Sequence, residues 1–246
     1  MRITKTFFIC VILLFSVSFN VYGQANRFCV VCKQNKPVSA FSGESKTCKV
    51  CVNNAEMKAA VESIERNKRL SSCGTFSEGL ASIKGGNGKY GYIDKSGKLV
   101  ISYQWREVGD FHEGLAWVKN DKSMNNIGFI DKTGKLVIPC QWEQVYDFSE
   151  GLAPVRKPVG DHIAFGFIDK NGKLVIPYKW FYAGPFSEGM AWVQDFHAKF
   201  GFIDKSGREV IPCKWEMVKP FKNGYADVQK KNGKWQKINK RGEVVK

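Results

Sequence analysis

The sequence repeats itself, and this feature constrains its fold more than any other. The phrase F-x-E-G-L-A and its close variants recur at steps of 35, 37, 38 and 35 residues, beginning at Phe76, Phe111, Phe148, Phe186 and Phe221. A second phrase, G-[YF]-I-D-K-x-G, begins at Gly91, Gly128, Gly166 and Gly201 and degrades at Gln236. A unit of about 35 residues cannot bury its apolar side chains alone, so five such units are expected to stack on their neighbours.

Each unit predicts three short β-strands. The stretch YGYIDKSGKLVIS, residues 90–102, reads as strand, turn and strand, and the phrase G-L-A-x-V adds a third strand. Asp94 and Gly97 fit a type I turn that glycine closes in the left-handed conformation. Equivalent pairs are Asp131/Gly134, Asp169/Gly172 and Asp204/Gly207. We therefore interpret the repeated aspartates as turn residues and not as acid catalysts.

Other repeated side chains are interpreted as scaffold. Four acidic residues that precede glycine are expected to be turn residues: Glu78, Glu113, Glu150 and Glu188. Four tryptophans recur in register with Val and Ile positions and are expected in the core: Trp105, Trp142, Trp180 and Trp215. Three cysteines occupy apolar positions of the units and are expected to be small buried side chains: Cys73, Cys140 and Cys213.

The units resemble WG repeats, which are named for an aromatic residue followed by glycine. That pair reads Tyr90-Gly91, Phe165-Gly166 and Phe200-Gly201, whereas Ile127-Gly128 and Trp235-Gln236 depart from it. The resemblance runs from about Leu70 to Lys246 and implies an all-β repeat module with no general catalytic activity. We expect an open, curved array of five units over residues 70–246, beginning in phase at Leu70. A five-bladed propeller is the alternative, although a four-stranded blade usually needs about 40–45 residues.

The first residues have the layout of a secretory signal peptide. Arg2 and Lys5 precede an apolar run of about a dozen residues, which ends in small residues at Gly23. We predict a signal peptide over residues 1–23, cleavage after Gly23 or Ala25, and an exported protein. A retained membrane anchor is the alternative, but the run is shorter than the roughly 20 residues that span a bilayer.

Residues 24–54 contain the strongest metal-binding pattern. Cys29, Cys32, Cys48 and Cys51 form C-x2-C, fifteen residues, C-x2-C, a spacing that can place four thiolates around one Zn²⁺ ion. The segment resembles a treble-clef zinc finger. Four thiolates saturate the metal, so the expected Zn²⁺ is structural. Two disulfides remain open because export leads to an oxidising compartment, and a redox pair is the third interpretation. A helical linker is expected over residues 55–69.

Recognition is expected where the units differ. The position after G-L-A varies and holds Trp117 and Trp192, which we expect to be exposed indoles able to anchor a partner. Variable loops carry His162 and His197, which have no metal-ligand spacing; solvated loop residues are the plainer interpretation, and we keep both as tentative binding residues.

The net charge of +15 leaves two function classes open. One lysine recurs at each hairpin turn, and we interpret these lysines as a solvated rim. Our leading hypothesis is an exported, non-catalytic module that binds a protein or a polysaccharide. The alternative is nucleic-acid binding through the finger and the basic surface. No nucleophile elbow, no paired carboxylates outside turns and no open metal site occur, so the sequence gives no indication of an enzyme.

Overall fold

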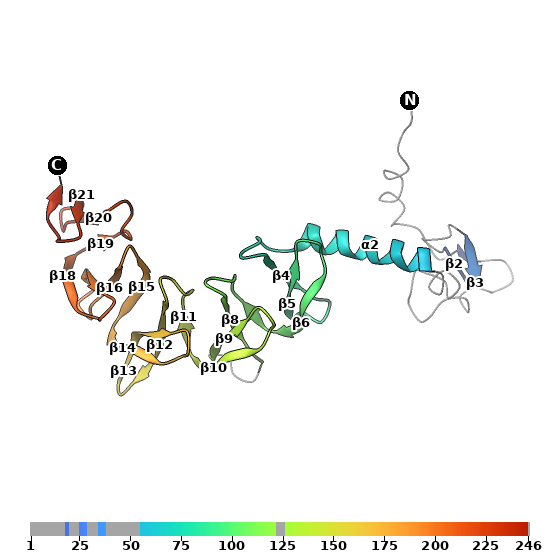
Figure 1. Cartoon of the computed structure of the whole chain (residues 1–246), viewed down its shortest axis with the longest axis horizontal. Coiled ribbons are helices and arrows are strands. Elements are labelled where there is room, and N and C mark those ends of the chain that lie inside the picture. The colour runs from blue at the N-terminus through green and yellow to red at the C-terminus, as the bar shows by residue number, and fades with distance from the viewer. Residues whose placement is uncertain (1–17, 20–24, 29–33, 38–54, 122–125, 246) are drawn as a thin grey trace, which may run out of the picture. The chain divides into compact units, whose positions relative to one another are not determined.

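The computed structural model describes residues 18–19, 25–28, 34–37, 55–121 and 126–245. The chain divides into two compact units, Met1–Ser71 and Ser72–Lys246 (Figure 1). The four cysteines of the expected zinc finger and most of the expected signal peptide lie outside the described residues.

The described residues of the first unit form a small sheet and helix α2. Strands β1 (Ser18–Phe19), β2 (Ala25–Phe28) and β3 (Asn35–Pro37) pair antiparallel in that order. Helix α2 (Ala55–Ser72) follows, and it includes Leu70, where the phase of the repeats was expected to begin. Among the described residues, no helix is both long and apolar enough to cross a membrane.

The second unit consists of five antiparallel sheets, here called sheets 1 to 5 in chain order. Sheet 1 contains β4 (Leu80–Lys84), β5 (Tyr90–Asp94) and β6 (Leu99–Trp105). Sheet 2 contains β7 (Glu107–Val108), β8 (Leu115–Lys119), β9 (Ile127–Asp131) and β10 (Leu136–Trp142). Sheet 3 contains β11 (Gln144–Val145), β12 (Leu152–Val159), β13 (His162–Asp169) and β14 (Leu174–Trp180).

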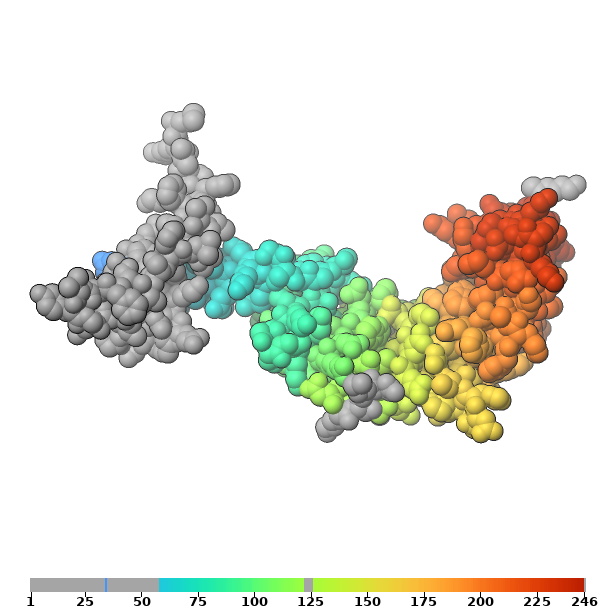
Figure 2. All heavy atoms as spheres, turned by 180° about the vertical axis from the view of Figure 1, so that it is seen from behind, coloured from blue at the N-terminus to red at the C-terminus, as the bar shows by residue number. Residues whose placement is uncertain are grey.

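Sheet 4 contains β15 (Tyr182–Ser187), β16 (Met190–Gln194), β17 (Phe200–Asp204) and β18 (Glu209–Trp215). Sheet 5 contains β19 (Met217–Val218), β20 (Tyr225–Gln229), β21 (Trp235–Asn239) and β22 (Val244–Val245). Within each sheet, strands that follow one another in sequence are hydrogen-bonded neighbours. Figure 1 shows the five sheets following one another in chain order within this unit, and in Figure 2 the colour of its atoms passes through the same order from green to red.

The prediction of three strands per unit was wrong for sheets 2 to 5, which have four. The additional strand directly follows the buried tryptophan and is as short as two residues. In sheet 2 it pairs Glu107 with Lys119 and Val108 with Val118. Two residues cannot show the alternation of polar and apolar side chains by which a strand is recognised, so the sequence pattern missed it.

The predicted hairpin turns are confirmed. In sheet 1 the carboxylate of Asp94 accepts hydrogen bonds from the backbone N–H groups of Ser96 and Lys98, at 2.8 and 3.1 Å. Gly97 has φ +79°, a conformation that favours glycine, and its N–H donates to the carbonyl of Asp94. The three equivalent turns repeat this geometry.

The core lies between consecutive sheets. All four repeated tryptophans are buried, which confirms the sequence interpretation. In each of sheets 1 to 4 one strand carries an aromatic ring that packs against the repeated phenylalanine of the next sheet, with ring centroids 4.8–5.1 Å apart. These strands are β5, β9, β13 and β17. The ring pairs are Tyr92/Phe111, Phe129/Phe148, Phe167/Phe186 and Phe202/Phe221. Each sheet therefore completes its core only when its neighbour is present.

The three cysteines of the repeats were expected to be buried, but they are only half-buried. Within the described part of the chain, no disulfide involves Cys73, Cys140 or Cys213. Burial raises the pKa of Cys140, and burial together with nearby Glu209 and Asp195 raises the pKa of Cys213 to about 12. The thiols of Cys140 and Cys213 are therefore protonated at neutral pH and are poor nucleophiles.

Candidate functional site

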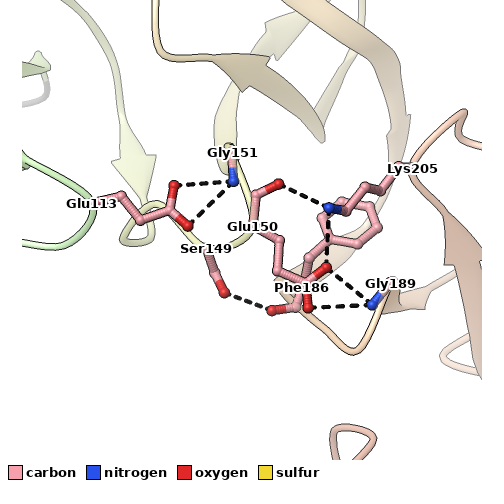
Figure 3. Close-up of polar contacts among 7 residues, drawn as sticks. All are labelled: Glu113, Ser149, Glu150, Gly151, Phe186, Gly189 and Lys205. Carbon is pink, nitrogen blue, oxygen red and sulfur yellow. Dashed lines mark hydrogen bonds and ion pairs between the residues drawn. The ribbon is translucent and has the colours of Figure 1, made fainter.

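The repeated glutamates join one sheet to the next (Figure 3). The carboxylate of Glu113 in sheet 2 accepts a hydrogen bond from the backbone N–H of Gly151 in the next repeat, at 3.0 Å, and Lys170 Nζ lies 3.0 Å from the same carboxylate. Glu150 makes the same contacts one repeat later, with Gly189 N–H at 3.0 Å and Lys205 Nζ at 3.1 Å. We call each Glu–Gly–Lys set a clamp.

Four clamps follow one another along the second unit. They are Glu78/Gly114/Lys132, Glu113/Gly151/Lys170, Glu150/Gly189/Lys205 and Glu188/Gly224/Lys240. Three of these connections have an additional hydrogen bond from a serine hydroxyl to the carbonyl of the next repeated phenylalanine. The serines are Ser77, Ser149 and Ser187, and their bonds measure 2.6–2.7 Å.

The clamps of Glu78 and Glu113 favour the charged form of the carboxylate. Partial burial raises the pKa of Glu113, but the hydrogen bonds from Lys170 and from Gly151 N–H outweigh it, so the pKa lies below its ordinary value. Glu78 has the same balance with Lys132 and Gly114. The backbone at the four clamp glutamates has φ between +49° and +55°. Residues other than glycine, asparagine and aspartate rarely adopt this conformation, so contacts elsewhere must compensate for its cost.

These contacts correct two interpretations. The glutamates are turn residues as expected, but they also connect neighbouring repeats. Four of the turn lysines are not simply a solvated rim, because each pairs with the glutamate of a preceding repeat. The charged residues that recur are thus used by the scaffold, and the residues that differ between repeats are the better candidates for recognition.

Trp117 and Trp192 are half-buried, whereas the variation at their position indicated exposed indoles. Each indole lies directly against a glycine, Gly109 after β7 or Gly184 in β15, and a Cβ atom on that glycine would overlap the ring. Both rings also pack against the buried clusters beside them. They therefore act mainly as packing residues, and their role in binding stays a prediction.

His162 lies in an exposed group of rings, and His197 does not. The ring of His162 is 5.5 Å from that of Phe196, and the ring of Phe196 is 5.8 Å from that of Phe181. Phe181 also contacts Tyr182 edge to face at 4.9 Å. We call His162, Phe181, Tyr182 and Phe196 the aromatic patch. Phe196 is 51% exposed and Phe181 is 44% exposed, so two large apolar rings face solvent.

The aromatic patch combines parts of sheets 3 and 4. His162 begins β13, whose hairpin with β12 has eight residues on each strand, whereas the equivalent hairpins of the other sheets have five. Val159, the cross-strand partner of His162, is also exposed, as is Ile163. The longer hairpin thus extends the exposed apolar surface beyond the rings.

His197 is almost fully exposed in the turn that also carries Phe196, between β16 and β17. Its backbone N–H donates to the carboxylate of Asp195 at 2.9 Å, and its ring Nδ1 lies 3.9 Å from that group. No cluster of three potential metal ligands occurs among the described residues, so neither histidine belongs to such a group there.

Phe181 and Phe196 were not predicted from the sequence. A signal for Phe181 was present, because it follows the repeated tryptophan at a position that holds Arg106, Glu143 and Glu216 in the other repeats. A phenylalanine where three repeats have charged residues is a departure from the repeat pattern, which marks the position as a candidate. Phe196 lies in a variable loop, where the sequence alone could not show that it meets Phe181.

Comparison with known families identifies the repeats. The family model described as "WG containing repeat" matches residues 90–122, 127–157, 165–195 and 200–235, more than half of the chain. No curated protein sequence matches this chain.

Three solved structures match at a distance. The designed Ika8 protein matches with a TM-score of 0.46 and 11% identity, covering 71% of this chain and 60% of that one. BamB from Moraxella catarrhalis has a TM-score of 0.40 and 10% identity, covering 70% and 58%. AztD from Citrobacter koseri has a TM-score of 0.41 and 14% identity, covering 71% and 57%. The matched part of this chain thus spans about three fifths of each of these proteins.

Proposed function

This chain belongs to the WG containing repeat family, and from that premise we propose that it is an exported, non-catalytic module that binds a protein or a polysaccharide. The observation that carries the proposal is the aromatic patch, where two exposed phenylalanines and His162 contact one another across two repeats. Exposed aromatic groups of this kind bind apolar side chains or stack on sugar rings.

The use of the repeated acids supports a non-catalytic role. The aspartates accept backbone N–H groups in hairpin turns, and the glutamates bind glycine N–H groups and lysines in the clamps. Each is engaged by a structural partner, and equivalent carboxylates belong to separate repeats. The repeated aspartates and glutamates are therefore not arranged as pairs for acid and base catalysis.

The proposal also includes an open array of sheets rather than a closed propeller. Its support is that the clamp contacts, the serine hydrogen bonds and the Trp142–Tyr178 hydrogen bond all join consecutive sheets. Small-angle X-ray scattering of residues 72–246 tests this part, because a ring of five blades gives a smaller radius of gyration than an open array.

The N-terminal part of the proposal concerns export and zinc. Residues 1–23 act as the leader, and Cys29, Cys32, Cys48 and Cys51 hold a structural Zn²⁺ ion, with two disulfides as the alternative. Metal analysis and thiol titration of protein purified from its native compartment separate these states. If these cysteines bind zinc, we expect one zinc per chain and four more titratable thiols after denaturation in chelator. If the protein contains no zinc and these four thiols do not titrate after denaturation, the cysteines form disulfides.

The main experiment removes the exposed rings. The double variant Phe181→Ala/Phe196→Ala is compared with Val100→Ala/Val137→Ala, which truncates two similarly exposed apolar side chains elsewhere. Binding is measured on an oligosaccharide array and by cross-linking to neighbouring proteins on intact cells. Loss of an anchoring ring typically weakens binding roughly tenfold or more. Equal binding by both variants and the unaltered protein would remove the aromatic patch from the proposal.

Nucleic-acid binding is the second candidate, and the net charge of +15 favours it. Its signature is a steep fall in affinity for DNA between low and moderate salt, because binding to phosphates releases counterions. Affinity for a protein or a neutral sugar would change far less over the same range.

A further inference from the structure

The face of sheet 5 that corresponds to the packing face of the earlier sheets is charged. In sheets 1 to 4 this face carries a buried aromatic residue on the middle strand, which packs against the next sheet. The equivalent residue of sheet 5 is Lys237, which is exposed. A lysine side chain cannot supply the ring contact that its counterparts make, and its ammonium adds a positive charge to this face.

Other substitutions on the same face produce a groove. In sheet 4, Gly184 makes room for the indole of Trp192, whereas Lys219 and Asp227 stand at these two positions in sheet 5. In sheet 4 the indole of Trp192 and the neighbouring sheet 5 occupy the space over this face. Over the same face of sheet 5 there is an open groove of about 720 Å³. Its lining includes Lys219, Lys222, Asn223, Tyr225, Asp227 and Lys237.

The groove is basic. It contains three lysines and one aspartate, and Lys219 Nζ lies 3.5 Å from Asp227 Oδ2. The same ammonium lies 5.2 Å from the centre of the Trp235 ring, and that of Lys237 lies 5.9 Å from the centre of the Tyr225 ring. These contacts keep the two cations beside aromatic surface, where a carboxylate and an apolar group of one ligand can both be bound.

The clamp position of sheet 5 also differs. Asn223 occupies the place of the clamp glutamates and has the same backbone conformation, φ +54°. Its neutral side chain cannot form the ion pair with lysine that the four clamps contain. Lys222 takes the place of the serine that donates to a phenylalanine carbonyl in three earlier connections. The face thus retains hydrogen-bonding groups but has exchanged negative charge for positive charge.

We infer that this groove binds an acidic segment of a partner protein. Four equivalent faces of the chain each receive a protein turn that contains an aromatic residue followed two residues later by Glu or Asn. The groove of sheet 5 has the same backbone framework with lysines added, so charge complementarity selects an acidic version of such a segment. This assigns a second surface, separate from the aromatic patch, and does not depend on it.

A short groove also distinguishes this ligand from a polyanion. Nucleic acids and sulfated polysaccharides bind along extended basic tracks, and their affinity grows with the number of phosphates or sulfates contacted. The groove has three lysines around one concave space and an aspartate among them. This arrangement suits one or two carboxylates on a compact turn.

The test uses the full chain and a fluorescein-labelled peptide of sequence DEFSEGED. Binding is followed by fluorescence anisotropy for the unaltered protein and two triple variants. The first is Lys219→Glu/Lys222→Glu/Lys237→Glu, within the groove. The matched control is Lys230→Glu/Lys231→Glu/Lys234→Glu, which makes the same charge change outside the groove lining. A Lys→Gln version of each triple variant removes the positive charges without adding negative ones, so it is less disruptive to folding. The folding of every variant is monitored by thermal unfolding.

The expected result is at least a tenfold weaker affinity for the groove triple and less than a threefold change for the control. Equal weakening by both triples would overturn the inference, since binding would then reflect net charge alone. Stronger binding of dextran sulfate or a short oligothymidine than of the peptide would also overturn it, in favour of a polyanion. The Phe181→Ala/Phe196→Ala variant should bind the peptide normally, so failure of the proposed function and failure of this inference give different results.

Discussion

The carboxylate of Glu113 accepts a hydrogen bond from the backbone N–H of Gly151 across the boundary between two repeats, at 3.0 Å. This contact recurs in all four connections between the five sheets. A residue that looks like part of a local turn is therefore also a long-range contact, and its contribution to stability can be measured.

Replacing a clamp glutamate should destabilise the array. Glu113→Asn keeps a side chain that tolerates positive φ, as Asn223 does in sheet 5, but removes the carboxylate. We expect the free energy of unfolding to fall by about 1 kcal/mol, because a charge-assisted hydrogen bond and a partly exposed ion pair are lost. Urea unfolding of residues 72–246 measures it, with Asn223→Asp as a control that alters the equivalent position outside a clamp. No change for Glu113→Asn would show that the clamp is energetically neutral.

Acid should weaken the array through the same groups. The pKa values of Glu78 and Glu113 are lowered in the folded protein, because their hydrogen bonds outweigh the effect of burial. Their contribution is complete above the ordinary glutamate pKa of 4.5 and is lost as the pH falls through the lower folded value. Melting temperatures between pH 7 and pH 3 should therefore decline mainly below pH 4.5. Glu78→Gln/Glu113→Gln should show a shallower decline, and an identical pH profile would contradict the assignment.

The tryptophan of sheet 2 depends on a tyrosine of sheet 3. Trp142 is 2% exposed, and its Nε1–H donates to the Tyr178 hydroxyl at 2.9 Å. Tyr178→Phe leaves this N–H buried without a partner, which should cost about 1–3 kcal/mol. Chemical denaturation measures the loss. Tyr103→Phe is the control, because it removes the hydroxyl at the equivalent position of sheet 1, and a similar cost in both variants would rule out the hydrogen bond as the cause.

The glycines beneath Trp117 and Trp192 should not tolerate a methyl group. In Gly184→Ala the added Cβ overlaps the indole of Trp192, so the ring must move out of its half-buried site. Overpacking of this kind typically costs about 1–3 kcal/mol. Gly86→Ala is the control, because no atom lies within 4 Å of the place that its added Cβ would occupy. A red shift in tryptophan emission should accompany the loss of stability in Gly184→Ala alone, and stability equal to that of the control would contradict the packing role.

Much of the scaffold could be predicted from the sequence because its causes are local. Asp94 and Gly97 form a turn through hydrogen bonds within five residues, and the same spacing recurs in the other repeats. The burial of Trp142 followed from its register with apolar strand positions. The two-residue strand Glu107–Val108 was missed, because its existence depends on pairing with β8 and not on its own pattern.

The sequence by itself determined the repeat, its turns and its core positions, because these depend on residues close together in the chain and recur with one period. Only the tertiary structure decided that Glu113 reaches Gly151, that Phe181 meets Phe196 and that Trp192 is wedged against a glycine. The physical reason is that stacking brings together side chains from different strands and repeats, and a period along the chain does not specify which atoms meet across that interface.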